Sequence, residues 1–378
     1  MVDGFFESDV SVFHRRNAWI ELDQDVLCRN ISAMKASLSG VAEIIQVVKA
    51  NAYGHGLTTI AVKAFDCGVR WFLVARLDEA MALRSVIPDA NILLLGAVWP
   101  ADVETLHENR IIPVLICEDQ ARQLARAAQA KGVSLVCHVK IDTGMGRFGF
   151  PWDKAPPMLL SLQQAGGLDI RGICMHFSSA GKVGDSFASV QASRFNQVVE
   201  GCRVCGLAGL FRHVANSAAF MAHPELDFDG VRVGILAYGY GGRRNESRVQ
   251  TRPFLQWKTR VLQVKDVPAG FPVGYLSTHV TPEATCLATI DVGYSDGFSR
   301  LMSNKGHVLV GGRRAKVVGR VTMNFTIVDV GLQGSVQAGD EVVLIGMQGN
   351  ETLWADELAR WCQTIPYEIL TNIRSEAL

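Results

Sequence analysis

The feature that most constrains the fold is an alternation of short apolar runs with helix-length stretches between about residues 20 and 240. The runs are rich in Val, Ile, Leu and Phe, as is typical of strands buried on both faces of a parallel sheet. They are residues 43–49, 70–75, 91–96, 111–116, 135–141, 168–175, 211–215 and 231–235. The pattern predicts an α/β fold with an N-terminal (β/α)8 TIM-type barrel, and a doubly wound parallel sheet is the competing arrangement.

The helix-length stretches and the last third of the chain indicate how the chain divides into domains. In the stretch 118–131, for example, Leu124, Ala125 and Ala128 share one helical face. After residue 244 the runs are strand-like and are separated by Gly and Pro, at 254–264, 284–292, 307–310, 315–320, 326–330 and 341–345, with one helical pattern at 354–364. We therefore expect a barrel domain over 1–243, whose first residues can pair with the next domain, and a C-terminal all-β domain over 244–378.

Composition excludes several classes of function. The 37 Lys and Arg residues balance 37 Asp and Glu, so no basic face is expected for nucleic acid. No apolar run approaches the roughly 20 residues of a membrane helix, and the N-terminal residues do not resemble a secretory signal. Only Cys202 and Cys205 form a Cys-x-x-Cys pair, without the second pair that a structural zinc site needs. We expect no metal, no membrane association and a reducing cytoplasmic location.

A lysine follows the first apolar run, where a barrel places its chemistry. Residues 47–56 read Val-Val-Lys-Ala-Asn-Ala-Tyr-Gly-His-Gly. A lysine at an apolar strand end loses hydration, which lowers its pKa and makes the amine nucleophilic toward a carbonyl compound, with a Schiff base as the product. The alternative is that the ammonium of Lys49 extends to solvent.

The loops after the seventh and eighth runs are where such barrels commonly bind phosphate. There the hydroxyl of Ser217 and the backbone N–H groups of Gly234 and Ile235 can contact an anion. The alternatives are a helix cap for Ser217 and a salt bridge for Arg232. A nucleophilic Lys49 together with a phosphate cradle in one barrel indicates pyridoxal phosphate.

Further polar residues follow other strands. Residues 140–147 read Lys-Ile-Asp-Thr-Gly-Met-Gly-Arg, and the sixth run leads to His176. A structural ion network and a buried core imidazole are the respective alternatives. In the second domain Tyr294 follows the run 284–292, a place where a phenol is often an amphipathic anchor. A tyrosine base needs nearby positive charge to lower its pKa, and Arg147 and His176 could supply it.

With these residues in view, the chain resembles the alanine racemase family nearly end to end. The matching motifs are residues 47–56, 140–147, 175–177, 215–218, 231–235, 293–297 and 365–370. The resemblance implies a fold type III pyridoxal 5'-phosphate enzyme, with a barrel followed by a β domain. It also implies a head-to-tail homodimer with shared active sites, and the interconversion of L- and D-alanine.

The resemblance implies a role for each matching residue. Lys49 would hold the cofactor and act as one acid/base, and Tyr294 of the partner subunit would be the other, on the opposite face. Arg232 would face the pyridine nitrogen, where a guanidinium that keeps its proton makes the ring a weaker electron sink. His176 would link Tyr294 to Arg232. Arg147 would contact the cofactor and the substrate carboxylate.

The remaining roles complete the implied site. The full cofactor-binding set is Lys49, Tyr53, Arg147, His176, Asn216, Ser217, Arg232, Gly234, Ile235 and Tyr367. Met323 would offer a backbone N–H to the substrate carboxylate, next to Arg147. Lys140 matches a lysine that some members of the family carbamylate.

Some positions depart from the family pattern. Gly181 stands where the family usually has Asp near the substrate entrance, residues 322–325 read Thr-Met-Asn-Phe in place of Cys-Met-Asp-Gln, and residues 274–279 end in His rather than an aromatic residue. A racemase of serine or of a broader set of amino acids is therefore the alternative. A decarboxylase or aldolase of this fold type is disfavoured by Arg232, and a non-catalytic pyridoxal phosphate carrier by the β domain with Tyr294.

Overall fold

The computed structural model describes residues 18–181, 186–241, 248–332 and 336–374, and the chain divides into two units. One unit is Asp23–Phe254, and the other combines Leu255–Leu378 with the chain before Asp23. The boundary expected between residues 243 and 244 falls in 242–247, outside the described residues.

The first unit contains a parallel sheet whose strands match the predicted runs. They are β2 (Glu43–Val47), β3 (Trp71–Val74), β4 (Asn91–Leu94), β5 (Ile111–Leu115), β6 (Leu135–Asp142), β8 (Leu168–Cys174), β9 (Phe211–His213) and β10 (Gly230–Val233). Their order is β10-β2-β3-β4-β5-β6-β8-β9, and a short strand β7 (Phe150–Pro151) pairs with β6. The first and last strands of the unit, β2 and β10, are neighbours, so the sheet curls into a ring.

Backbone contacts bring together the ends of this ring. Arg232 on β10 donates its backbone N–H to the carbonyl oxygen of Ala215, just after β9, at 2.9 Å. An isolated parallel bridge joins Asn216 to the same arginine. The barrel prediction is confirmed, and the doubly wound sheet, which would leave two open edges, is wrong.

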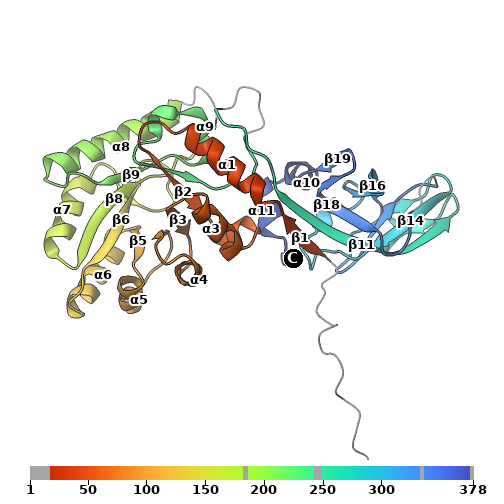
Figure 1. Cartoon of the computed structure of the whole chain (residues 1–378), viewed down its shortest axis with the longest axis horizontal. Coiled ribbons are helices and arrows are strands. Elements are labelled where there is room, and N and C mark those ends of the chain that lie inside the picture. The colour runs from red at the N-terminus through yellow and green to blue at the C-terminus, as the bar shows by residue number, and fades with distance from the viewer. Residues whose placement is uncertain (1–17, 182–185, 242–247, 333–335, 375–378) are drawn as a thin grey trace, which may run out of the picture. The chain divides into compact units, whose positions relative to one another are not determined.

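Helices form the outer layer around the parallel strands (Figure 1). They are α1 (Gln24–Ala36), α3 (Leu57–Asp66), α4 (Leu77–Val86), α5 (Val103–Glu108), α6 (Glu118–Ala130), α7 (Ala155–Ala165), α8 (Ser186–Val204) and α9 (Ser217–Ala222). On α6 the buried residues include Leu124, Ala125 and Ala128, which confirms the predicted inner face. Asp23 caps α1 by accepting the N–H groups of Asp25 and Val26.

The second unit is an antiparallel sheet that closes on itself. Its strands are β1 (Trp19–Leu22), β11 (Leu255–Val267), β14 (Thr285–Ile290), β15 (His307–Val310), β16 (Arg313–Val317), β17 (Thr326–Asp329), β18 (Glu341–Gln348) and β19 (Glu351–Leu353). Closure occurs because the long strand β11 pairs with both β14 and β18. The chain's first described strand, β1, also pairs with β11, with Trp19 opposite Lys258.

Shorter elements complete the second unit. The strands β12 (Pro272–Val273) and β13 (His279–Val280) form a small hairpin, and the helices α10 (Ala355–Cys362) and α11 (Pro366–Thr371) follow β19. The six strand-like runs and the helical pattern at 354–364 are confirmed. The pairing of β1 with β11 agrees with the expectation that the first residues can pair with the β domain, whereas the hairpin, β19 and α11 were not predicted.

The described residues contain no helix long and apolar enough to cross a membrane. All nine cysteines are described, and seven of them are free thiols, including Cys202 and Cys205. Cys28 on α1 and Cys67 after α3 form a disulfide, which no spacing motif in the sequence indicated.

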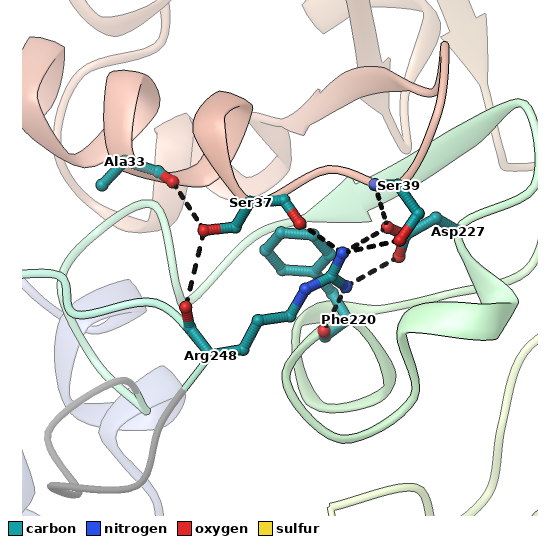
Figure 2. A network of polar contacts seen from close by, with 6 residues as sticks. All are labelled: Ala33, Ser37, Ser39, Phe220, Asp227 and Arg248. Atoms are coloured by element: carbon teal, nitrogen blue, oxygen red, sulfur yellow. Dashed lines mark hydrogen bonds and ion pairs between the residues drawn. The ribbon is translucent and has the colours of Figure 1, made fainter.

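A buried ion pair fastens the segment that leaves the barrel (Figure 2). Arg248 donates to both carboxylate oxygens of Asp227, at 3.0 and 2.6 Å, and to the carbonyl oxygen of Phe220 at 2.9 Å. The same guanidinium contacts Ser37 and Ser39 beyond α1. The carboxylate of Asp227 is only 1% exposed and also accepts the N–H of Ser39. One arginine thus joins the chain after residue 247 to α1 and α9.

Replacing this arginine tests the anchor. Arg248→Leu leaves the carboxylate of Asp227 buried without its partner, and breaking a buried ion pair costs about 3–5 kcal/mol. We expect the urea midpoint to fall by the concentration that corresponds to this loss of unfolding free energy. The matched control is Arg203→Leu, which removes an exposed partner of Glu200 and should leave the midpoint unchanged. Equal midpoints for the two variants would show that the network does not stabilise the barrel.

Candidate active site

The lysine expected at the end of the first barrel strand begins a left-handed turn. The strand β2 ends at Val47, and α2 (Lys49–Tyr53) follows with φ values of 54°, 53°, 52° and 56° at Ala50, Asn51, Ala52 and Tyr53. Left-handed helical backbone costs L-residues roughly 1–2 kcal/mol each. Four such residues in a row mark a strained segment of the kind that clusters at functional sites.

Neighbouring groups hold this turn in place. The carboxylate of Glu79 on α4 accepts the backbone N–H of Ala50 at 2.7 Å and that of Ala75 at 3.0 Å. The side chain of Asn51 accepts the N–H of Leu57 at 2.8 Å, which caps α3. The ring of Tyr53 stacks on Tyr238 with centroids 4.8 Å apart. These contacts fix the direction in which Lys49 leaves the backbone.

Lys49 is exposed in this chain, and its electrostatic environment lowers the pKa of its amine. Burial and the positive charge of Arg147 lower the pKa of Lys49, while Glu79 acts in the opposite direction. The neutral amine is the nucleophilic and basic form. The guanidinium of Arg147 lies 4.9 Å from the ring centre of Phe148.

Arg232 occupies the barrel interior and is held by backbone oxygens. Its guanidinium donates to the carbonyl oxygens of Met175 at 2.7 Å, Val214 at 3.1 Å and His213. It also donates to Nδ1 of His176 at 3.4 Å. Burial and the positive charges of Arg232 and Arg147 lower the pKa of His176 to about 3, so this imidazole is neutral at physiological pH. The structure thus shows carbonyl acceptors around the Arg232 guanidinium, in place of the salt bridge that was the alternative.

A small polar cradle lies where β9 and β10 end. The hydroxyl of Ser217 accepts the backbone N–H groups of Gly234 at 3.1 Å and Leu236 at 3.4 Å. A Cβ at residue 234 would lie 2.4 Å from the phenol oxygen of Tyr53, so only glycine fits there. Asn216, not Ser217, caps α9, through the N–H of Ala219 at 2.9 Å. A hydroxyl, backbone N–H groups and a phenol gather here as phosphate recognition requires.

The loop after β6 is shaped by two polar side chains. Asp142 accepts the N–H groups of Gly144 and Gly146 at 2.9 and 3.1 Å. Gln191 on α8 donates to Thr143 Oγ1 and to the carbonyl oxygen of His176, both at 3.2 Å, and so joins the loops after β6 and β8.

Lys140 is buried in the barrel beside this loop. Its amine donates to the carbonyl oxygen of Ile141 at 3.1 Å, and burial lowers its pKa to about 8. A substantial fraction of the amine is therefore neutral near physiological pH.

Tyr294 lies in the second unit, on a loop fastened to the loop that carries Met323. Its N–H donates to the carbonyl oxygen of Thr322 at 3.0 Å, and both the N–H and the hydroxyl of Ser295 donate to that of Met323. Asn324 donates to the hydroxyl of Ser295 at 3.1 Å. The two loops line a cavity of about 560 Å³, and the side chain of Tyr294 is 42% exposed.

The structure brings most of the predicted site residues together at one end of the barrel. The carboxyl ends of the parallel strands carry Lys49, Tyr53, Arg147, His176, Asn216, Ser217, Arg232, Gly234 and Ile235. Tyr294, Met323 and Tyr367 belong to the second unit, with Tyr367 on α11.

Sequence reasoning missed the residues that hold this set in place. Glu79, Gln191 and His213 are polar residues in amphipathic or apolar segments, without a motif around them. Each acts on a backbone or side-chain group far along the chain, and only the fold brings these groups together.

Comparison with known proteins agrees with this geometry. Family models match residues 22–241, as the alanine racemase N-terminal domain, and 254–377, as the alanine racemase C-terminal domain. The chain belongs to the alanine racemase family. The alanine racemase of Carboxydothermus hydrogenoformans is 41% identical over 360 residues, which cover 95% of this chain and 97% of that protein.

Solved structures of the alanine racemase family share the fold. The enzyme from Streptomyces lavendulae matches with a TM-score of 0.90 and 30% identity, over 96% of this chain and 97% of that one. The alanine racemase from Bartonella henselae, solved with covalently bound pyridoxal phosphate, matches with a TM-score of 0.85 and 29% identity, over 96% of this chain and 99% of that one.

The left-handed turn can be tested through its anchor. Glu79→Ala removes the acceptor of three backbone N–H groups, those of Ala50, Ala75 and Arg76, and a lost charged hydrogen bond of this kind costs about 1–3 kcal/mol. We expect lower stability in urea and faster amide hydrogen exchange at Ala50 and Ala75. Asp78→Ala is the control, since Asp78 bonds Arg76 on the surface. Unchanged exchange at Ala50 in the Glu79 variant would contradict the anchoring role.

Proposed function

We propose that the chain interconverts L- and D-alanine by a two-base mechanism in which Lys49 and Tyr294 are the bases. Membership of the alanine racemase family makes it a pyridoxal phosphate-dependent racemase, an isomerase of amino acids. The observation that carries the proposal is the convergence of Lys49, with its lowered pKa, and the cradle around Gly234 at one end of the barrel.

The cradle fits the phosphate group of this cofactor. Ser217 supplies a hydroxyl, the backbone of Gly234 and Ile235 supplies N–H groups, and Tyr53 lies against Gly234 where a side chain would otherwise stand. The family resemblance assigns Tyr367 to the same phosphate. When bound, pyridoxal phosphate supplies an electron sink for negative charge at the α-carbon of an amino acid.

Arg232 sets the strength of that electron sink. Its guanidinium is held by carbonyl oxygens and by the neutral His176, and a guanidinium does not give up its proton. With the cofactor bound, Arg232 would donate a hydrogen bond to the pyridine nitrogen, which would then carry no proton of its own. This weak sink favours proton transfer over decarboxylation, which is why the decarboxylase alternative is disfavoured.

Racemisation requires that a proton leaves one face of the α-carbon and returns to the other. The amine of Lys49 removes or returns the proton on one face, and the phenol of Tyr294 acts on the opposite face. Arg147 and the backbone N–H of Met323 bind the substrate carboxylate and so orient the α-hydrogen toward the two bases.

The proposal includes a homodimer with shared sites, and the surface around Tyr294 supports it. Large side chains stand exposed on the loops near it: Tyr275 at 71%, Leu276 at 83%, Met323 at 56% and Phe325 at 46%. Exposed apolar groups gathered on one face mark an interaction site, and a second copy of the chain is the commonest partner. In this arrangement Tyr294 completes the barrel site of the partner subunit.

Two further assignments accompany the proposal. Lys140 is the site of carbamylation, because an amine with a pKa of about 8 is partly neutral and can react with carbon dioxide. The location is cytoplasmic, because seven of the nine cysteines are free thiols, as is typical of a reducing compartment; the Cys28–Cys67 disulfide is the observation that counts against it.

The direct test of the function is a panel of L-amino acids with resolution of the enantiomers produced. We expect L-alanine to reach equal amounts of both enantiomers, and D-alanine to approach the same mixture. Removing the cofactor with hydroxylamine should abolish the activity, and adding pyridoxal phosphate should restore it. Turnover of serine at a rate similar to alanine would establish the broader racemase instead, and no turnover of any amino acid would refute the proposal.

A mixed dimer tests the two bases and the shared site together. Tyr294→Phe keeps the ring but removes the phenol, and losing a positioned acid/base costs on the order of a hundred- to ten-thousand-fold in rate. In deuterated water this variant should still exchange the α-proton of one enantiomer, by way of Lys49. Lys49→Ala should be inactive, and its mixed dimers with Tyr294→Phe should regain one working site in two. If subunit exchange restores no activity, the sites are not shared.

A further inference from the structure

Two buried histidines lie behind Arg232 in the barrel interior. His213, at the end of β9, and His138, on β6, are 0% and 1% exposed. Their rings are joined by a contact of 2.9 Å between Nε2 of His213 and Nδ1 of His138. Nδ1 of His213 lies 3.3 Å from the Nη1 atom of Arg232.

The chemistry of Arg232 fixes where the protons lie in this chain of contacts. A guanidinium only donates, so Nδ1 of His213 must accept and its proton must be on Nε2. That Nε2–H then donates to Nδ1 of His138, which must also be unprotonated. Both imidazoles are therefore neutral Nε2–H tautomers, and the hydrogen bonds run from Arg232 outward to His138.

The local fold is built to admit the ring of His138. The pairing of β6 with β8 shifts register between Cys137 and His138, a bulge of the kind that re-aims a side chain. The extra residue is Arg171 on β8, and the next residue, Gly172, pairs with His138; a Cβ on Gly172 would lie 2.5–2.7 Å from three atoms of the His138 ring. The rings of Trp71 and Phe211 lie 5.9 Å from that of His138. A glycine and a bulge thus create a slot of one ring's size.

We propose that His138 is a positioning residue for the racemase reaction, acting on Arg232 through His213. By accepting the Nε2–H of His213, it holds that imidazole in the tautomer whose Nδ1 accepts from Arg232. The guanidinium of Arg232 then keeps its position, and its remaining N–H groups stay available to the cofactor ring. This inference rests on the proposed role of Arg232 at the pyridine nitrogen.

The electrostatic setting is consistent with neutral rings. Burial lowers the pKa of His138 to about 4, and burial together with His138 and Arg232 holds the pKa of His213 well below its usual value. Two neutral rings can share one hydrogen bond, whereas two imidazolium ions beside Arg232 would repel one another and it.

The first test needs no variant and no activity. Nitrogen-15 NMR of the histidine-labelled apoprotein reports which ring nitrogen carries the proton. We expect Nε2–H tautomers for both His138 and His213 at neutral pH. A protonated Nδ1 on His213 or on His138 would overturn the inference, whatever the enzyme's substrate proves to be.

The second test compares variants of the slot. His138→Phe keeps a ring against Gly172 but offers no acceptor, and His138→Asn restores an acceptor near the position of Nδ1. Phe211→Leu is the packing control, because Phe211 contacts both imidazoles without taking part in their hydrogen bond. Because misplaced catalytic groups cost up to about a hundredfold, we expect kcat to fall about tenfold or more in His138→Phe, with KM for alanine nearly unchanged.

The pattern across these variants decides the role. His138→Asn should keep kcat within about threefold of the parent enzyme, and the apoprotein of His138→Phe should bind pyridoxal phosphate more weakly than that of Phe211→Leu. Equal kcat values for His138→Phe and Phe211→Leu would show that His138 only fills space. Should His138→Phe fail to fold, the recovery in His138→Asn and the tautomers of the parent apoprotein still decide the question.

Discussion

The candidate active site depends on the carboxylate of Glu79, which fixes the first N–H of a left-handed turn. That turn follows Lys49 and includes Tyr53, and its left-handed backbone costs L-residues roughly 1–2 kcal/mol each. Isolated, the sequence would relax to another conformation. The packed helices and strands around it supply the compensating contacts, so the placement of one amine is a property of the whole barrel.

Several positively charged side chains lie at the same end of the barrel, and the partners of Arg232 there are neutral groups. Carbonyl oxygens and an unprotonated imidazole surround Arg232, while the pKa values of Lys49 and Lys140 are lowered mainly by burial. A cation held by dipoles keeps its full charge for an anionic or electron-rich ligand, whereas a carboxylate partner would neutralise it. The site is thus suited to a phosphate-bearing cofactor and a substrate carboxylate.

The sequence predicts the barrel strands because strands buried on both faces must be continuous apolar runs. It also indicates Lys49, Arg232, Ser217 and Gly234, since each stands just after or within such a run. The left-handed turn carries no comparable signal, because Ala, Asn and Tyr have no common preference for it. The role of Glu79 could not be predicted because its carboxylate acts on a backbone group far along the chain. The helix α11 could not be predicted because it is too short to show a helical hydrophobic period.

The pairing of β1 with β11 has a consequence for how the chain is made. Trp19 leaves the ribosome early, yet its partner Lys258 emerges only after the entire barrel has been synthesised. Domains generally fold as units in the order of synthesis, so the barrel can form while the first strand of the β unit still lacks its neighbour. The barrel is in this sense an insertion within the β unit. A contiguous gene fragment that begins at Leu255 encodes a sheet without β1.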